Sequence, residues 1–149
     1  MGSNGKIYLG YITSSISHFI RNTFQKDVFI TSLTAKKIKK KHPPLDKEFI
    51  FTCVSMGNPH AITVVKDTEK FDVETYGRIL EVDKAFPNKT NVEFVQIVDK
   101  EHIKMRVWER GTGETLACGT GACSSVVAGY LNNFTNRKVN VELLGGNLG

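Results

Sequence analysis

Short apolar runs separated by polar residues dominate the chain after its first third, and they predict a sheet-rich fold. Five runs are rich in β-branched and aromatic side chains, at residues 49–54, 61–65, 92–98, 102–108 and 138–144. The first two flank the sequence GNP at residues 57–59, which is typical of a turn. The pattern therefore predicts five strands, the first two joined by a loop that presents polar groups.

Two other segments predict helices. Residues 72–80 form a short helical pattern that begins after Asp72, a residue type that caps helix N-termini. Residues 119–131 lack proline and are rich in small side chains. Apolar positions recur there at helical spacing: Ala122, Val126, Val127 and Tyr130. We therefore expect an α+β fold, with a mainly antiparallel sheet wrapped around one principal helix.

The chain divides into two parts of different character. Residues 1–48 show weak periodicity, so we expect an N-terminal segment and basic linker there and a domain at residues 49–149. The length of 149 residues and the hydrophobic content of 40% suit one soluble domain. No apolar run approaches the roughly 18 residues that span a bilayer, and the N-terminus lacks the apolar core of a secretory signal. The expected location is cytoplasmic, without a membrane contact.

The net charge of +5 is concentrated in one short segment. Five lysines lie between residues 36 and 41, and without them the basic and acidic residues balance. Pro43 and Pro44 follow directly, so a solvated loop is the favoured interpretation. A nucleic-acid contact is the alternative, but no aromatic residues are interleaved with the lysines, and nucleic acid is not an expected partner.

Three cysteines occur in the chain: Cys53, Cys118 and Cys123. An odd number without an export signal favours a reducing compartment. No Cys-x-x-Cys pair is present, and none of the four histidines lies at ligand spacing from a cysteine pair, so we expect no metal site. Cys53 lies within an apolar strand and Cys123 lies one turn inside the second helix, so both are expected to be buried packing residues.

Cys118 has a different environment, because Gly119 and Thr120 follow it and open the predicted helix. A thiol at a helix N-terminus ionises more readily, since it lies near free backbone N–H groups and the positive end of the helix dipole. Gly119 and Gly121 lack side chains, which lets a ligand approach N–H groups that bind carboxylates. The pattern predicts a reactive thiol beside a carboxylate site, an arrangement suited to amino-acid chemistry.

Four sequence blocks carry a family resemblance. They are VSMGNPHA at residues 54–61, NVEF at 91–94, ERG at 109–111 and ACGTGAC at 117–123. In this order they resemble the C-terminal half of diaminopimelate epimerases, and the resemblance extends from about Phe49 to Asn147. It implies an isomerase of lysine and peptidoglycan precursor synthesis that interconverts LL- and meso-diaminopimelate without pyridoxal phosphate or any other cofactor.

The resemblance also implies roles for individual residues. In the family, two cysteines face opposite sides of the α-carbon, and Cys118 matches the one from the C-terminal half. His60 and Glu109 match polar residues close to the catalytic cysteines. The remaining matches are substrate contacts: Gly119 and Thr120 at the carboxylate of the reacting centre, and Asn58, Asn91, Glu109 and Arg110 at the distal end.

Other interpretations of these residues stay open at the level of the sequence. Arg110 alone suggests a surface ion pair, Asn58 and Asn91 suggest turn chemistry, and His60 suggests a structural histidine beside an apolar run.

The family's first catalytic cysteine lies in a glycine- and asparagine-rich N-terminal block that has no counterpart here, and Cys53 is only a weak substitute. We therefore expect half of an active site, completed by an N-terminal epimerase domain or by a second copy of the chain, and no epimerisation by the chain alone. A non-catalytic carboxylate-binding remnant and another cofactor-independent amino-acid racemase are the alternatives.

Overall fold

A computed structural model describes residues 47–149 and, N-terminal to them, the two-residue strand β1 (Ala35–Lys36). The lysines at residues 37–41 and nearly all of the expected N-terminal segment lie outside the described residues. The division of the chain at residue 48 therefore stays a prediction.

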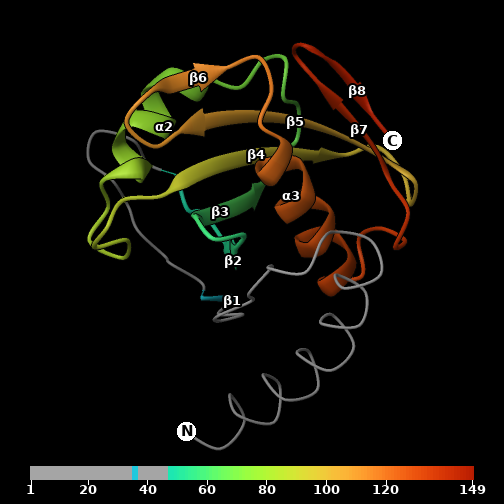
Figure 1. Cartoon of the computed structure of the whole chain (residues 1–149), viewed down its shortest axis with the longest axis horizontal. Helices are drawn as coiled ribbons and strands as arrows, with labels where there is room; N and C mark the ends of the chain where they lie inside the picture. The colour runs from blue at the N-terminus through green and yellow to red at the C-terminus, as the bar shows by residue number, and fades with distance from the viewer. Residues whose placement is uncertain (1–34, 37–46) are drawn as a thin grey trace, which may run out of the picture.

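The described part of the chain forms one eight-stranded mixed sheet (Figure 1). The strands after β1 are β2 (Phe51–Ser55), β3 (Pro59–Val64), β4 (Asn91–Ile97), β5 (His102–Glu109), β6 (Gly113–Thr115), β7 (Asn140–Leu143) and β8 (Gly146–Leu148). Their order across the sheet is β1-β2-β3-β4-β5-β7-β8, and β6 pairs with β5. The β3–β4 and β5–β7 pairs are parallel and the other five pairs are antiparallel, as the sequence predicted for most of the sheet.

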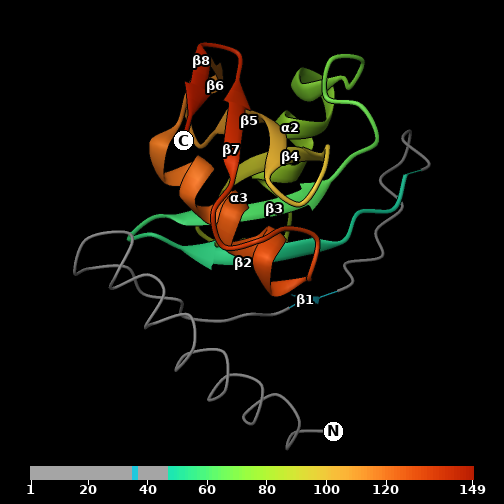
Figure 2. The ribbon, with the colours of Figure 1, turned by 90° about the vertical axis from the view of Figure 1, so that its right-hand side faces the viewer.

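Helix α3 (Gly119–Leu131) has the bounds that the helical spacing predicted, and it lies between β2–β3 and β7–β8 in Figure 2. Its Val126 and Val127 belong to a buried cluster with Val95 and Met105 from the central strands. This packing confirms the α+β class and the single principal helix inside a curved sheet.

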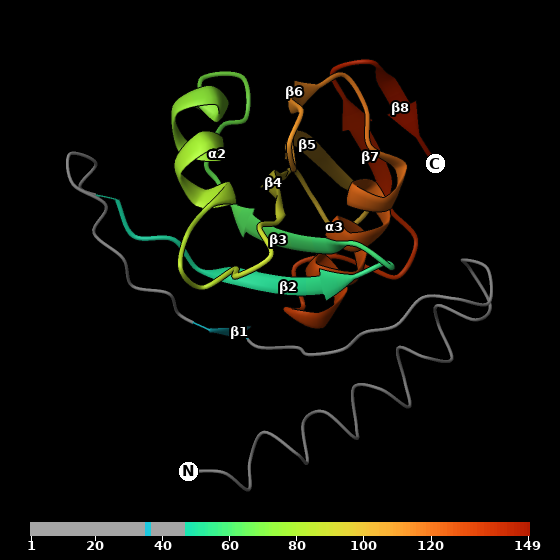
Figure 3. The same ribbon diagram turned by 60° about the vertical axis from the view of Figure 1, so that its left-hand side comes forward.

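Helix α2 (Val73–Glu81) covers the opposite face of β4 and β5 (Figure 3). Successive side chains of a strand point to opposite faces, so Phe94 packs with α2 while Val95 packs with α3. Asp72 caps α2 as expected, since its carboxylate accepts a hydrogen bond of 3.0 Å from the Thr75 backbone N–H. A side chain at Gly77 would lie within 2.5 Å of the Trp108 ring, so only glycine allows this close approach.

The sequence pattern missed three short strands: β1, β6 and β8. After β5 the chain reverses at Gly111 and Gly113, both with positive φ, and continues as β6 alongside β5. The last expected strand, residues 138–144, is shorter than predicted and returns as β8 after Gly146, which also has positive φ. Within the described residues, no helix is long and apolar enough to cross a membrane.

Candidate active site

The expected site residues gather at one edge of the sheet. The first residues of the parallel strands β3 and β4 lie side by side there, with His60 opposite Asn91. Strand β5 runs in the opposite direction, so its last residue, Glu109, reaches the same edge. Cys118 caps the start of α3, and its Sγ and Glu93 Oε1 of β4 both lie close to Gly121, which brings this helix N-terminus to β4.

His60 and Glu93 form a fully buried pair, and His60 Nδ1 lies 2.6 Å from Glu93 Oε1. Burial raises the pKa of Glu93, His60 opposes that rise, and the charge of Glu109 adds to it. Glu93 lies in the NVEF block but was not among the expected site residues. The available signal was a charged residue between the apolar residues Val92 and Phe94 of a predicted strand.

His60 also contacts Asn58, in the turn that leads into β3. His60 Nε2 lies 3.1 Å from Asn58 Oδ1. Gly57, with a φ of 93°, provides the left-handed backbone conformation that this turn requires. Asn58 is half-buried, and its Nδ2 forms no hydrogen bond to any residue that the structure describes. Its side-chain oxygen is therefore engaged while its NH₂ group is available.

Asn91 anchors the loop that carries Arg110. The Asn91 side-chain oxygen accepts a hydrogen bond of 2.7 Å from the Arg110 backbone N–H, and Asn91 itself is buried. The Arg110 side chain is exposed and donates to the Asn88 carbonyl at 3.2 Å. The guanidinium therefore lies at the surface, while a buried amide holds the backbone of the same residue.

Glu81 holds the same loop from α2. Its carboxylate accepts hydrogen bonds of 2.8 Å from the Gly111 backbone N–H and from Trp108 Nε1. Burial opposes ionisation of Glu81, but these two donors leave its pKa below the ordinary value. The backbone around Arg110 is thus fixed from two sides, by Glu81 and by Asn91.

Glu109 is half-buried at the end of β5. Its Oε1 accepts a hydrogen bond of 2.5 Å from the Thr115 hydroxyl on β6, the neighbouring strand. Strand β6, which the sequence analysis missed, therefore orients one of the expected site residues.

Cys118 is the N-cap residue of α3, and its sulfur accepts a hydrogen bond of 3.4 Å from the Gly121 backbone N–H. The Thr120 hydroxyl lies 3.6 Å from the same sulfur. Cys118 is half-buried, and Gly119 and Thr120 are exposed. The expected position of the thiol at a helix N-terminus is therefore observed.

Gly119 and Gly121 differ in a way that the sequence did not indicate. The space beside Gly119 is open, as expected for a ligand contact. A Cβ at Gly121, in contrast, would lie 2.8 Å from Glu93 Oε1 and 3.2 Å from Cys118 Sγ. Gly121 is buried, and the absence of its side chain makes room for protein atoms rather than for a ligand.

The other two cysteines are partly buried packing residues. Burial, with a smaller effect from the charge of Glu93, raises the pKa of Cys53 to about 11. Burial also raises the pKa of Cys123. Cys53 is therefore poorly suited to act as a thiolate near neutral pH.

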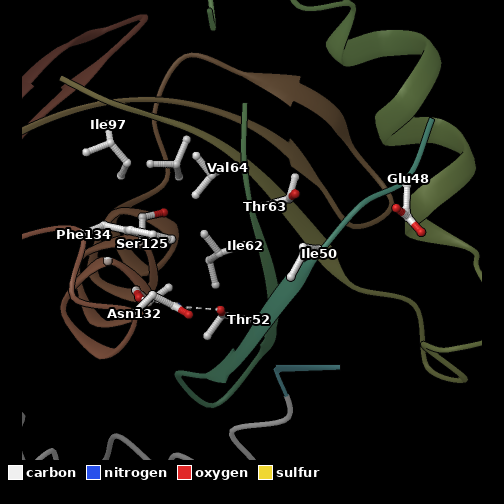
Figure 4. Close-up of a pocket in the computed structure, with 13 residues that line it drawn as sticks. Glu48, Ile50, Thr52, Ile62, Thr63, Val64, Ile97, Ser125, Asn132 and Phe134 are labelled. Atoms are coloured by element: carbon white, nitrogen blue, oxygen red, sulfur yellow. Dashed lines mark hydrogen bonds between the residues drawn. The ribbon is translucent and has the colours of Figure 1, made fainter. Parts of the chain in front are cut away.

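A separate cavity of about 230 Å³ lies between β2, β3 and α3 (Figure 4). Asn132 and Thr52 line it, and the Asn132 side chain donates a hydrogen bond of 2.9 Å to the Thr52 hydroxyl. None of the expected site residues lines this cavity. The edge formed by β3, β4, β5 and α3 is therefore the candidate site, and the cavity is not part of it.

Comparison with known proteins supports the family resemblance that the four sequence blocks carry. The profile of the family described as "Diaminopimelate epimerase" matches residues 52–149, about two thirds of the chain. The chain belongs to the diaminopimelate epimerase family. The match includes every residue expected in the site.

Curated relatives and a solved structure extend the comparison. The diaminopimelate epimerase of Methanococcus maripaludis strain S2 is 52% identical over 118 residues, covering 74% of this chain and 43% of the relative. The diaminopimelate epimerase of Acetivibrio thermocellus is 56% identical over 102 residues, covering 68% of this chain and 36% of the relative. A Bacillus anthracis phenazine biosynthesis protein of the PhzF family overlaps with a TM-score of 0.47 and 26% identity, over 67% of this chain and 33% of that one. The chain thus spans less than half the length of these relatives.

Proposed function

We propose that this chain supplies the C-terminal half of a diaminopimelate epimerase active site. The observation that carries the proposal is that, in a member of this family, Cys118 caps a helix N-terminus next to strands that end in amide and guanidinium side chains, which would suit a carboxylate. The reaction would interconvert LL- and meso-diaminopimelate, a step of lysine and peptidoglycan precursor synthesis.

Cys118 would act directly on the α-proton. Its thiolate takes the proton and its electron pair forms the S–H bond, leaving the C–H electrons on the α-carbon. In the opposite direction, the Cys118 thiol returns a proton to that carbon. The backbone N–H groups of Gly119 and Thr120 would bind the substrate carboxylate, where negative charge develops in the transition state.

Inversion needs a second acid on the other face of the α-carbon. Cys53 and Cys123 are partly buried in the packing of the domain, and their raised pKa values make them poor candidates. We propose that the second thiol comes from an N-terminal epimerase domain or from a second copy of the chain. Proton transfer between two sulfur atoms requires no cofactor.

The distal end of the substrate would bind at Asn58, Asn91 and Arg110. Both asparagine oxygens are engaged by protein groups, so their NH₂ groups are the donors left for an anion. The guanidinium of Arg110 suits bidentate recognition of a carboxylate. His60 and Glu109 would be the polar residues close to the catalytic thiols, and His60 also bonds Asn58.

The test follows proton exchange in deuterated water. Proton NMR would monitor LL-diaminopimelate with the purified chain alone, and with the N-terminal half of the Methanococcus maripaludis relative added. We expect the mixture to lose the α-proton signal and produce the meso isomer, and the chain alone to produce no meso isomer. Cys118→Ala should abolish the reaction of the mixture, and Cys53→Ala should preserve it.

Three outcomes would contradict the proposal. Turnover by the mixture that survives Cys118→Ala would remove Cys118 from the reaction. Binding of diaminopimelate without any exchange in the mixture would favour a non-catalytic carboxylate-binding module. Exchange of a different amino acid instead of diaminopimelate would favour another cofactor-independent racemase.

A further inference from the structure

Glu93 is a buried carboxylate that the proposed proton transfer does not use. Its side chain is fully buried, and its Oε2 has no hydrogen-bond partner among the residues that the structure describes. Placing a carboxylate in such a position is costly unless strong partners compensate. In the described part of the chain, the side chain that hydrogen-bonds to this carboxylate is that of His60. An effect of Glu93 on the polar groups of the site can therefore pass through that histidine.

The number of protons on this pair follows from the surrounding acceptors. Asn58 Oδ1 faces His60 Nε2 at 3.1 Å and can only accept, so Nε2 carries a hydrogen. One further proton lies on the 2.6 Å line between His60 Nδ1 and Glu93 Oε1, held by one atom or the other. A continuous hydrogen-bonded chain thus runs from Glu93 through His60 to Asn58.

These two hydrogen bonds determine which way the amide of Asn58 faces. With its oxygen held on His60 Nε2–H, the Asn58 NH₂ group is left without a partner in the described residues. If Nε2 lost its hydrogen, the amide would turn and present its oxygen outward instead, which repels an anion. Asn91 reaches the same orientation independently, through the Arg110 backbone N–H.

We propose that Glu93 is a positioning residue that acts through His60 to keep the Asn58 NH₂ group facing outward, as a donor to a substrate carboxylate. The last link, to the carboxylate, rests on the function proposed above. The link from Glu93 to Asn58 stands on the hydrogen bonds alone.

A second contact places Glu93 close to Gly121, in the first turn of the helix that Cys118 caps. Glu93 Oε1 and Cys118 Sγ approach the same side of Gly121, 2.8 and 3.2 Å from where its Cβ would stand. Gly121 also donates its N–H to Cys118. Glu93 therefore contacts both His60, which bonds Asn58, and the first turn of the helix that begins after Cys118.

The test compares two matched substitutions in the full chain, Glu93→Gln and Glu81→Gln. Both replace a buried carboxylate with an amide of nearly equal size, but Glu81 contacts Trp108 and Gly111 rather than His60. Nitrogen-15 NMR would record the ring nitrogens of His60 and the NH₂ group of Asn58. A dispersed backbone spectrum of each variant establishes that it folds.

In the parent chain we expect a strongly downfield His60 Nδ1 proton, a protonated Nε2 and one set of Asn58 NH₂ signals. The substitution Glu93→Gln permits both neutral forms of the ring, because the new amide can donate to Nδ1 or accept from it. It should therefore remove the downfield signal and broaden or double the Asn58 signals. Glu81→Gln should change neither. Unchanged His60 and Asn58 signals in Glu93→Gln, or equal changes in Glu81→Gln, would overturn the proposal.

Titration with LL-diaminopimelate tests the last link. In Glu93→Gln the Asn58 NH₂ group is no longer held toward the substrate carboxylate. The loss of this hydrogen bond to a charged group should weaken binding by about tenfold. Equal affinity of the parent chain and Glu93→Gln would overturn the link to the carboxylate. If diaminopimelate moved no signal in the parent chain, the proposed function would fail, while the ring and amide signals would still decide the role of Glu93.

Discussion

The carboxylate of Glu93 occupies the space that a side chain at Gly121 would need. A Cβ at Gly121 would lie 2.8 Å from Glu93 Oε1, and that oxygen is held by His60. Strand β4 and the start of α3 therefore approach each other more closely here than any residue other than glycine permits. The close approach also brings the buried His60–Glu93 pair next to the first turn of α3, which Cys118 caps.

Gly121→Ala should consequently destabilise the fold. The new methyl group must displace a buried, hydrogen-bonded carboxylate, and overpacking of this kind costs about 1–3 kcal/mol. Urea unfolding monitored by circular dichroism measures the change. Gly119→Ala is the matched control, since the space beside Gly119 is open and alanine is favoured in helices. Equal stability of Gly121→Ala and the parent chain would contradict this packing.

The thiols should differ in reactivity. Cys118 lies half-exposed at a helix N-terminus, whereas burial raises the pKa of Cys53 to about 11. At pH 8 a thiol with that pKa is ionised in only about one molecule in a thousand. Iodoacetamide should therefore label Cys118 first, as mass spectrometry of tryptic peptides would show. Labelling of Cys53 as fast as Cys118 at pH 8 would contradict the assignment.

The same burial of Cys53 predicts a dependence of stability on pH. Its pKa in the folded chain, about 11, is above the ordinary value of 9.0, so the folded state holds this proton more tightly than the unfolded state does. The stabilisation is complete below about pH 9 and is lost as the pH rises toward about 11. The free energy of unfolding should fall less steeply over this interval in Cys53→Ala. Parallel pH curves for the two proteins would exclude the effect.

Trp108, the one tryptophan of the chain, reports on Glu81. The pKa of Glu81 is lowered, so its two hydrogen bonds are stable above the ordinary carboxyl range and weaken only as the pH falls below it. Acidification should change Trp108 fluorescence with a midpoint below pH 4.5, before or together with unfolding. In Glu81→Gln this transition should be absent, and its persistence would assign it to another group.

The sequence alone predicted the local elements of the site better than their contacts. Helix α3 was placed correctly because thirteen residues with helical spacing and a capping position leave little ambiguity. Strands β6 and β8 were missed because each has only three residues, too few for an alternating pattern. Their positions depend on glycines with positive φ, which the sequence shows only as a turn-forming composition.

The His60–Glu93 pair could not be predicted from the sequence for a different reason. These residues are 33 positions apart, and they meet because β3 and β4 pair in parallel across the connection that contains α2. Parallel register is determined by the packing of the whole sheet, not by either strand. The resemblance to the family singled out His60 as a candidate site residue, but it did not identify the carboxylate that holds it.

Arg110 gives the sharpest test of substrate recognition, because lysine differs from diaminopimelate mainly in lacking one carboxylate. If Arg110 and the two asparagine amides bind the distal carboxylate, the chain should bind diaminopimelate more tightly than lysine. Arg110→Ala should weaken diaminopimelate binding by about tenfold or more and leave lysine binding nearly unchanged, since a charge-assisted hydrogen bond is lost only for the first ligand. Arg78→Ala is the control, because Arg78 is an exposed partner of Glu74 on α2. NMR titration gives both affinities, and an equal loss for the two ligands would show that Arg110 supports the loop rather than the distal carboxylate.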